Sequence, residues 1–256
     1  MNYIDQTGHN ITLERLPKRI VSLVPSQTEL LYHLGIDPIG QTIFCFHPKT
    51  KFKRATKIGG TKKLQLEKIR DLKPDLIIGN KEENQKEQIE KLREEFPVWL
   101  SDIYTLQNAI EMITQIGSIV GKSTKADALA RVISNGFKNL NLQNKGSAVY
   151  LIWKNPYMAA GRKTFINSVL ESAGYSNVIQ NEASRYPTID IEEMVKMKPN
   201  HILLSSEPFP FNKAHINEVQ QIFPEANVKL VDGELYSWYG PRLLKTLKLL
   251  TTPVAP

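Results

Sequence analysis

The stretch Leu66–Ile78, LEKIRDLKPDLII, returns in the second half of the chain as Ile191–Leu203, IEEMVKMKPNHIL. Each copy has an apolar residue and a glutamate, a short amphipathic helical pattern, Lys-Pro, Asp or Asn, and an apolar run. Proline ends the helix and pushes the residue before it out of the α region. The apolar run predicts a strand that is covered on both faces. A unit of this kind used twice indicates two lobes of the same construction.

The segments upstream of each copy also correspond. Arg19–Pro25 predicts a strand, and Ser26–Glu29 has the capping-box pattern of a helix start, with Gly35 as its end. The second half offers a strand over Ser147–Trp153 and a helix over Thr164–Ala173. Each half therefore reads strand, helix, strand, helix, strand, which is an α/β lobe with a mainly parallel sheet.

The segment between the halves, Thr105–Asn139, has apolar residues at helical spacing. A helix of about 35 residues would span roughly 50 Å, too long for a connection within one lobe. We expect one long backbone helix joining two Rossmann-like α/β lobes; the alternative is two ordinary helices with a turn at Gly121. The expected boundaries are 1–103 for the N-terminal lobe, 104–143 for the linking helix and 144–256 for the C-terminal lobe.

Composition narrows the function classes. The 256 residues are 41% hydrophobic and 23% charged, with a net charge of +7, which is the usual globular balance. The lysines are scattered and often beside acids, and no nucleic-acid-binding motif accompanies them, so we expect no nucleic acid partner. The single cysteine, Cys45, can form no internal disulfide, and we expect it to be a small buried apolar residue.

The start of the chain, Met1–Gly8, has no basic segment followed by an apolar one and is not a signal peptide. No run of about 18 apolar residues predicts a transmembrane helix. If Met1 is the native start, we expect a cytoplasmic protein. The phosphate-loop, dinucleotide, serine-hydrolase and zinc-protease motifs are all absent, and the five histidines are not paired at metal-ligand spacing. No catalytic residue and no metal ligand is therefore assigned.

Aromatic and polar residues gather where the predicted strands end. Ligands of α/β sheets lie beyond the carboxyl ends of the strands, and large rings in loops suit a large, partly apolar ligand. Arginines add positive charge for carboxylates or phosphates. The alternative is that these rings plug the loops onto the lobe cores. The expected ligand-binding residues are Pro25, Ser26, Phe44, Phe46, His47, Trp153, Tyr157, Arg162, Arg185, Tyr186, Trp238, Tyr239 and Arg242.

The start Arg19–Leu30, the strand Leu72–Ile78 and the long central helical segment resemble the class III, helical-backbone periplasmic binding proteins of ABC importers. The resemblance runs from about Arg19 to Leu250. Further stretches are similar to a cobalamin-receptor branch: Gly59–Lys62, Glu82–Asn84, Ser206–Phe211, Val231–Gly233 and Ser237–Gly240.

This resemblance implies a non-enzymatic substrate-binding protein that holds a cobalamin (corrinoid) or an iron chelate, siderophore or haem, in the cleft between its lobes. It implies a monomer with no prosthetic group, a periplasmic or cell-surface location, and an ABC permease that docks on one glutamate of each lobe, Glu87 and Glu218 by position. Two other functions stay open. One is a free metal-ion receptor of related fold, and the other is a two-lobed transferase or chelatase using His47 with Glu82 or Glu83.

Overall fold

The computed structural model describes residues 1–140, 143–180 and 183–252. The chain forms two compact units. Unit 1 comprises Met1–Asp102, Gln107–Ser134 and Tyr239–Arg242, and unit 2 comprises Ile103–Leu106, Asn135–Trp238 and the chain from Leu243 onward. The division expected from the sequence, with boundaries at 1–103, 104–143 and 144–256, stays a proposal.

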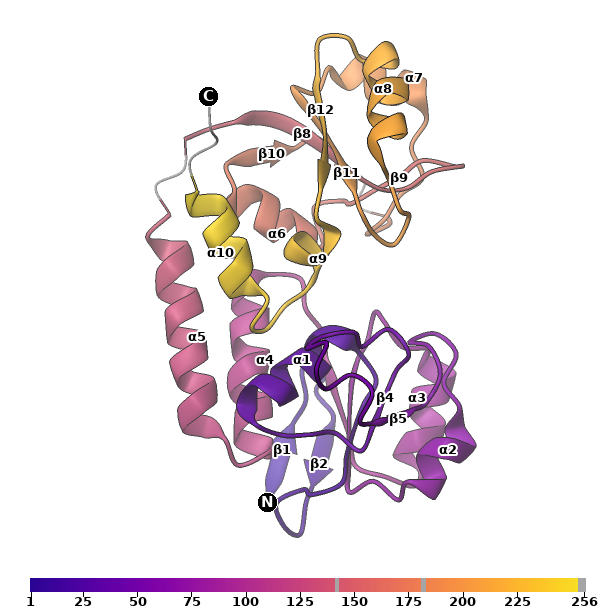
Figure 1. Cartoon of the computed structure of the whole chain (residues 1–256), viewed down its shortest axis with the longest axis vertical. Helices are drawn as coiled ribbons and strands as arrows, with labels where there is room; N and C mark the ends of the chain where they lie inside the picture. The colour runs from indigo at the N-terminus through magenta and orange to yellow at the C-terminus, as the bar shows by residue number, and fades with distance from the viewer. Residues whose placement is uncertain (141–142, 181–182, 253–256) are drawn as a thin grey trace. The chain divides into compact units, whose positions relative to one another are not determined.

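Unit 1 is built on a parallel sheet with strand order β5-β4-β3-β6-β7. Helices α2 and α3 lie together beside this sheet (Figure 1) and bury Ile69, Ile89 and Leu92 against it. The N-terminal strands β1 and β2 pair separately as an antiparallel ribbon. The elements of this unit are β1 (Asn2–Ile4), β2 (Asn10–Thr12), β3 (Ile20–Ser22), α1 (Pro25–Leu34), β4 (Gly40–Gln41), β5 (Thr56–Lys57), α2 (Leu66–Asp71), β6 (Leu76–Asn80), α3 (Lys86–Arg93), β7 (Val98–Ser101) and most of α4 (Leu106–Ile119).

Unit 2 has the sheet order β10-β8-β11-β12, all parallel, with β9 added antiparallel to β8. Helices α7 and α8 lie together on one face (Figure 1), where Met194 and Val219 join the core formed with Val149 and Ile202. The elements are β8 (Gly146–Trp153), β9 (Met158–Ala159), α6 (Phe165–Ser172), β10 (Tyr175–Asn177), α7 (Ile191–Met197), β11 (His201–Ser205), α8 (Lys213–Ile222), β12 (Asn227–Val231), α9 (Gly233–Ser237) and α10 (Leu243–Thr251); α5 (Ser123–Lys138) is shared between the units.

The predicted repeat is confirmed down to the backbone. The lysines before the two repeat prolines, Lys73 and Lys198, both adopt left-handed conformations, with φ of 43° and 45°. The residue that follows each repeat proline also has the same role in both copies. Asp75 accepts hydrogen bonds from the backbone of Lys18 and Arg19, and Asn200 accepts one from the backbone of Ser147.

Two α/β lobes with mainly parallel sheets are therefore confirmed, but the single long backbone helix is wrong. Helix α4 ends at Ile119 and α5 begins at Ser123. Gly121 has a φ of 66°. Its amide donates to the Ser118 carbonyl at 3.1 Å, and the Lys122 amide donates to the Gly117 carbonyl at 2.7 Å. This pair of bonds is the Schellman helix end, which glycine favours because it lacks a Cβ.

The capping box expected at Ser26–Glu29 is also wrong. Helix α1 starts with Pro25 in its first turn, its N-cap is Val24, and no side chain caps it. Proline suits this position because its missing N–H would have no partner there. The Glu29 side chain instead binds Arg242. The predicted end of the helix is confirmed, since Gly35 is the C-cap with a φ of 87°.

Candidate ligand site

The carboxyl edge of the unit 1 sheet gathers five of the predicted ligand-binding residues. Pro25 and Ser26 follow β3, and Phe44, Phe46 and His47 follow β4. Parallel strands end at the same edge, so these residues come from neighbouring loops. Phe44 and Phe46 are 46% and 49% exposed. Two large rings held in solvent on one loop offer an apolar surface to a ligand.

Cys45 anchors this loop from below. It lies between the two exposed phenylalanines but is itself fully buried, as the sequence predicts. Its Sγ lies 3.2 Å from the Thr28 hydroxyl and 3.1 Å from the Thr42 hydroxyl. Burial raises the pKa of the thiol, which disfavours the reactive thiolate. The cysteine therefore has a packing role that turns its two neighbours outward.

A buried polar network lies under the ends of β6 and β7 in unit 1. Gln27 donates to the Gly79 carbonyl at 3.0 Å and to the Ser101 hydroxyl at 2.6 Å. Asn80 donates to the same hydroxyl, and its own oxygen accepts from the Glu82 and Glu83 amides. The network fixes the turn after β6. Polar residues scattered over distant stretches gave no sequence signal for it.

Tyr239 and Arg242 pack within unit 1 and are only 7% and 3% exposed. Arg242 forms a two-point ion pair with Glu29, with Nε to Oε2 at 3.0 Å and Nη2 to Oε1 at 2.9 Å. Burial raises the pKa of the Tyr239 hydroxyl. The burial of these two residues agrees with the alternative that they pack a loop onto the lobe core. Their contact with a ligand stays a prediction.

The carboxyl edge of the unit 2 sheet carries a second aromatic group. Trp153 is the last residue of β8 and is 40% exposed. Its ring meets Phe209 edge-on, with centroids 5.7 Å apart, and Phe209 meets Phe211 at 4.7 Å. Phe209 follows β11 and was not among the expected ligand-binding residues, although the Phe-Pro-Phe sequence that contains it was the available signal.

Tyr157 and Glu218 come together in unit 2. The Tyr157 hydroxyl lies 3.4 Å from Glu218 Oε1, and Lys154 Nζ lies 2.5 Å from Glu218 Oε2. The hydrogen bond from the Lys154 ammonium holds the pKa of Glu218 below its usual value. A residue expected to bind ligand and one expected to dock a permease thus share one surface cluster.

Trp238 is held by a glutamate. The indole Nε1 donates to Glu207 Oε1 at 2.8 Å, and the Ser237 hydroxyl donates to the same oxygen at 3.0 Å. Glu207 follows β11, and Trp238 directly follows α9. Burial is the main cause that raises the pKa of Glu207, and Asp232 and Glu234 raise it further against the two hydrogen bonds.

The remaining predicted residues lie beside the start of α6. Arg162 is exposed in the loop after β9. Arg185 covers the Tyr104 ring at 4.1 Å and donates to the carbonyls of Lys163 and Ile103. Its neighbour Tyr186 is half-buried. The structure therefore binds Arg185 into unit 2 and leaves Arg162 the more accessible of the two guanidinium groups.

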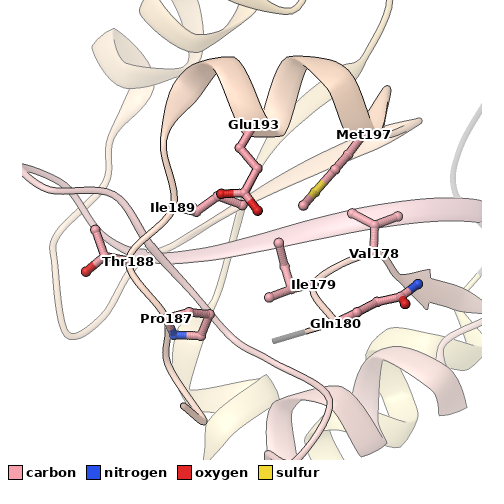
Figure 2. A pocket seen from close by; sticks show the side chains of 8 residues that line it. All are labelled: Val178, Ile179, Gln180, Pro187, Thr188, Ile189, Glu193 and Met197. Carbon is pink, nitrogen blue, oxygen red and sulfur yellow. The ribbon is translucent and has the colours of Figure 1, made fainter. Parts of the chain in front are cut away.

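A separate pocket of about 440 Å³ lies at the end of β10 in unit 2. In Figure 2 the Glu193 carboxylate and the Met197 thioether of α7 reach toward Val178 and Ile179, with Pro187 on the other side. None of these residues was among the expected ligand-binding residues. The pocket lining is about equally polar and apolar, and Gln180 and Thr188 join Glu193 as its polar side chains.

Within the described residues, no group of three or more His, Cys, Asp and Glu side chains is arranged to hold a metal ion. Among those same residues, no helix is long and apolar enough to cross a bilayer.

Two α/β units with parallel sheets, each with exposed aromatic rings at its carboxyl edge, define the architecture of a solute-binding protein. The chain belongs to the periplasmic binding protein family, whose model matches residues 20–226.

The chain also resembles individual members of this family. It is 26% identical over 272 residues to an uncharacterized ABC transporter substrate-binding lipoprotein of Bacillus subtilis, YvrC, with 98% of this chain and 84% of that protein covered. It is 25% identical over 194 residues to the vitamin B12-binding protein of Salmonella typhimurium, with 74% and 73% covered.

Solved structures share the fold at lower identity. The vitamin B12-binding protein BtuF of Vibrio cholerae superposes with a TM-score of 0.80 at 20% identity, covering 92% of this chain and 95% of that one. The siderophore-binding protein BauB gives 0.79 at 17%, covering 98% and 96%. The haem-binding protein RhuT of Roseiflexus gives 0.76 at 19%, covering 91% and 96%. At these identities the likeness shows the fold alone.

Proposed function

We propose that this chain is the substrate-binding protein of an ABC-type importer and captures a cobalamin (corrinoid) or an iron chelate, siderophore or haem. Membership of the family supports a binding role, and the names of the relatives supply the ligand class. The ligand is cargo and not a prosthetic group. One relative is named as a lipoprotein, which supports export to the periplasm or the cell surface.

The observation that carries the proposal is the exposure of large rings at the carboxyl edges. Phe44 and Phe46 in unit 1 and Trp153 in unit 2 keep 40% or more of their surface in solvent. Fully burying a side chain of this size is worth about 1.5–3 kcal/mol, and these rings, which are 40–49% exposed, have somewhat less than half of that free energy still to gain. A ligand with a partly apolar surface would gain it by covering the rings at either carboxyl edge.

The test is a titration of the purified protein with cyanocobalamin, haem and a ferric siderophore. Trp99 is fully buried, so ligand-dependent changes in tryptophan fluorescence report on Trp153 and Trp238. We expect saturable quenching by at least one of the three ligands, and no response to any of them would refute the proposal.

Two substitutions and a matched control locate the surface. Phe44→Ala and Trp153→Ala should each weaken binding several-fold, because an aromatic contact is worth roughly 1 kcal/mol beyond its area. Leu249→Ala removes an apolar side chain of 45% exposure near the end of α10, a helix that carries none of the expected ligand-binding residues. Its affinity should equal that of the wild type. Equal losses in all three variants would argue against binding at the carboxyl edges.

We propose docking of a permease through Glu87 and Glu218. The two residues lie in α3 and α8, the helices that follow the equivalent strands β6 and β11. Glu87 is exposed in the first turn of α3. Charge reversal of both glutamates to arginine should abolish ligand uptake by cells that depend on this importer, and Glu87→Arg alone should reduce uptake while ligand affinity stays unchanged. Uptake at the wild-type rate would exclude this docking.

A further inference from the structure

Glu207 has two carboxylate oxygens in different situations. Oε1 accepts from Trp238 Nε1 at 2.8 Å and from the Ser237 hydroxyl at 3.0 Å. Oε2 has no hydrogen bond or ion pair to any described residue. Glu207 is half-buried, as is Trp238. The residue therefore orients an indole ring with one oxygen and keeps the other available beside that ring.

The electrostatic surroundings of this carboxylate are acidic. The charged groups that act on it are Asp232, which caps α9, and Glu234 in the same helix. Tyr150 is the further titratable group nearby, a buried hydroxyl bound to Ser205. No lysine or arginine among the described residues forms an ion pair with Glu207, so its negative charge is not neutralised within the unit.

We propose that Glu207 and Trp238 form a subsite for a ligand edge that carries hydrogen-bond donors, such as primary amides, and that this subsite selects an amide-bearing corrinoid over a carboxylate-bearing haem. The inference rests on the proposed function. It deepens that function by naming the ligand class that the unit 2 edge accepts.

The physical reason is that the Glu207 carboxylate attracts a ligand amide and repels a ligand carboxylate. An amide N–H donates to Oε2 in a charge-assisted hydrogen bond, which is stronger than a bond between neutral groups. A ligand carboxylate at the same place would meet three acids and would be repelled. The side-chain amides of cobalamin satisfy the first condition, whereas the propionates of haem meet the second.

Two variants separate the charge of Glu207 from its hold on Trp238. Glu207→Gln keeps an oxygen that accepts from the indole but removes the charge, whereas Glu207→Ala removes both. Glu192→Gln, on the exposed face of α7, makes the same charge change away from the subsite. Near-UV circular dichroism of the ligand-free proteins should change in Glu207→Ala and stay like the wild type in the other two.

The affinities for cyanocobalamin and haem then test the proposal. We expect Glu207→Gln to bind cyanocobalamin roughly tenfold more weakly than the wild type and haem several-fold more tightly, with Glu192→Gln unchanged for both. Wild-type binding of cyanocobalamin that Glu207→Gln leaves unaltered would overturn the subsite but not the proposed function. A wild type that prefers haem to cyanocobalamin would also overturn the subsite. A wild type that binds neither of these two nor a ferric siderophore would overturn both.

Discussion

The ion pair between Arg242 and Glu29 gives the sharpest test of a structural role against a ligand-binding one. The sequence places Arg242 among the ligand contacts, whereas the structure buries it against α1 with two hydrogen bonds of 3.0 and 2.9 Å. Its side chain is 4% exposed and that of Glu29 is 15% exposed. Arg242→Met keeps the length of the side chain and leaves the half-buried Glu29 carboxylate without this partner.

The expected cost follows from that burial. Breaking a buried ion pair by removing one partner costs about 3–5 kcal/mol, because the remaining charge stays out of water. For a chain of this size each kcal/mol lowers the melting temperature by about 2–4 °C. We therefore expect a fall of about 6–20 °C in thermal unfolding followed by circular dichroism. The double variant Glu29→Met with Arg242→Met should recover most of the loss, since it leaves no unpaired charge.

The control and the ligand titration complete this test. Arg54→Met removes an exposed guanidinium whose ion pair with Asp37 is 3.7 Å long, and such surface pairs are worth about 0–1 kcal/mol. Folded Arg242→Met should bind its ligand as the wild type does. A variant that keeps its melting temperature but loses affinity would show that the sequence-based role of Arg242 is right and the structural reasoning wrong.

Three further outcomes follow from local geometry. Gly121→Val should lower the free energy of unfolding by about 1–2 kcal/mol, because a branched residue must adopt the φ of 66° at the α4–α5 turn. Urea unfolding measures this change, and an unchanged midpoint would contradict the Schellman turn. Thr164→Ala should cost about 1 kcal/mol in the same assay, since the Thr164 hydroxyl accepts the Asn167 amide at the start of α6, and Thr164→Ser should retain most of it. The folded-state pKa of Glu207 is raised above 4.5. The stability of the wild type relative to Glu207→Gln should therefore be greatest below pH 4.5 and fall as the pH rises through the folded-state pKa. A stability difference that is constant from pH 4 to 8 would exclude this shift.

The fold was predictable because its signals are local and occur twice. The Lys-Pro step after α2 and α7 fixes a helix end and a strand start from neighbouring residues alone, without knowledge of the rest of the molecule. The wrongly predicted long helix shows the limit of this reasoning. Gly121 is a candidate turn in the sequence, but the repeat on either side of the segment favours one helix that joins two lobes. The turn prevails because two amide donors close on the α4 carbonyls around a residue with positive φ.

The site was predictable only in part, because its contacts join residues far apart in the chain. Strand ends could be located, which is why Phe44 and Trp153 could be assigned to the carboxyl edges. Nothing in the sequence says that Glu29 on α1 meets Arg242, or that Trp238 meets Glu207. Each of these pairs turns a residue that looks available in the sequence into one whose orientation is set by a partner.

The two copies of the repeat share a hydrogen bond that stabilises each sheet and differ in the residues that follow the strand. Asp75 and Asn200 stand just before equivalent strands and bind the backbone of the neighbouring strand in the same way. The opposite ends of those strands differ, since Asn80 ends β6 and accepts two amides of its own turn, whereas β11 leads to Glu207 and the ring it holds. The amino edges of the two sheets therefore carry the same kind of hydrogen bond, whereas the carboxyl edges differ. The carboxyl edge is where α/β sheets bind ligands. The two edges therefore offer different chemistry, an acidic acceptor beside an indole ring at Glu207 in unit 2 and an exposed apolar ring at Phe44 in unit 1.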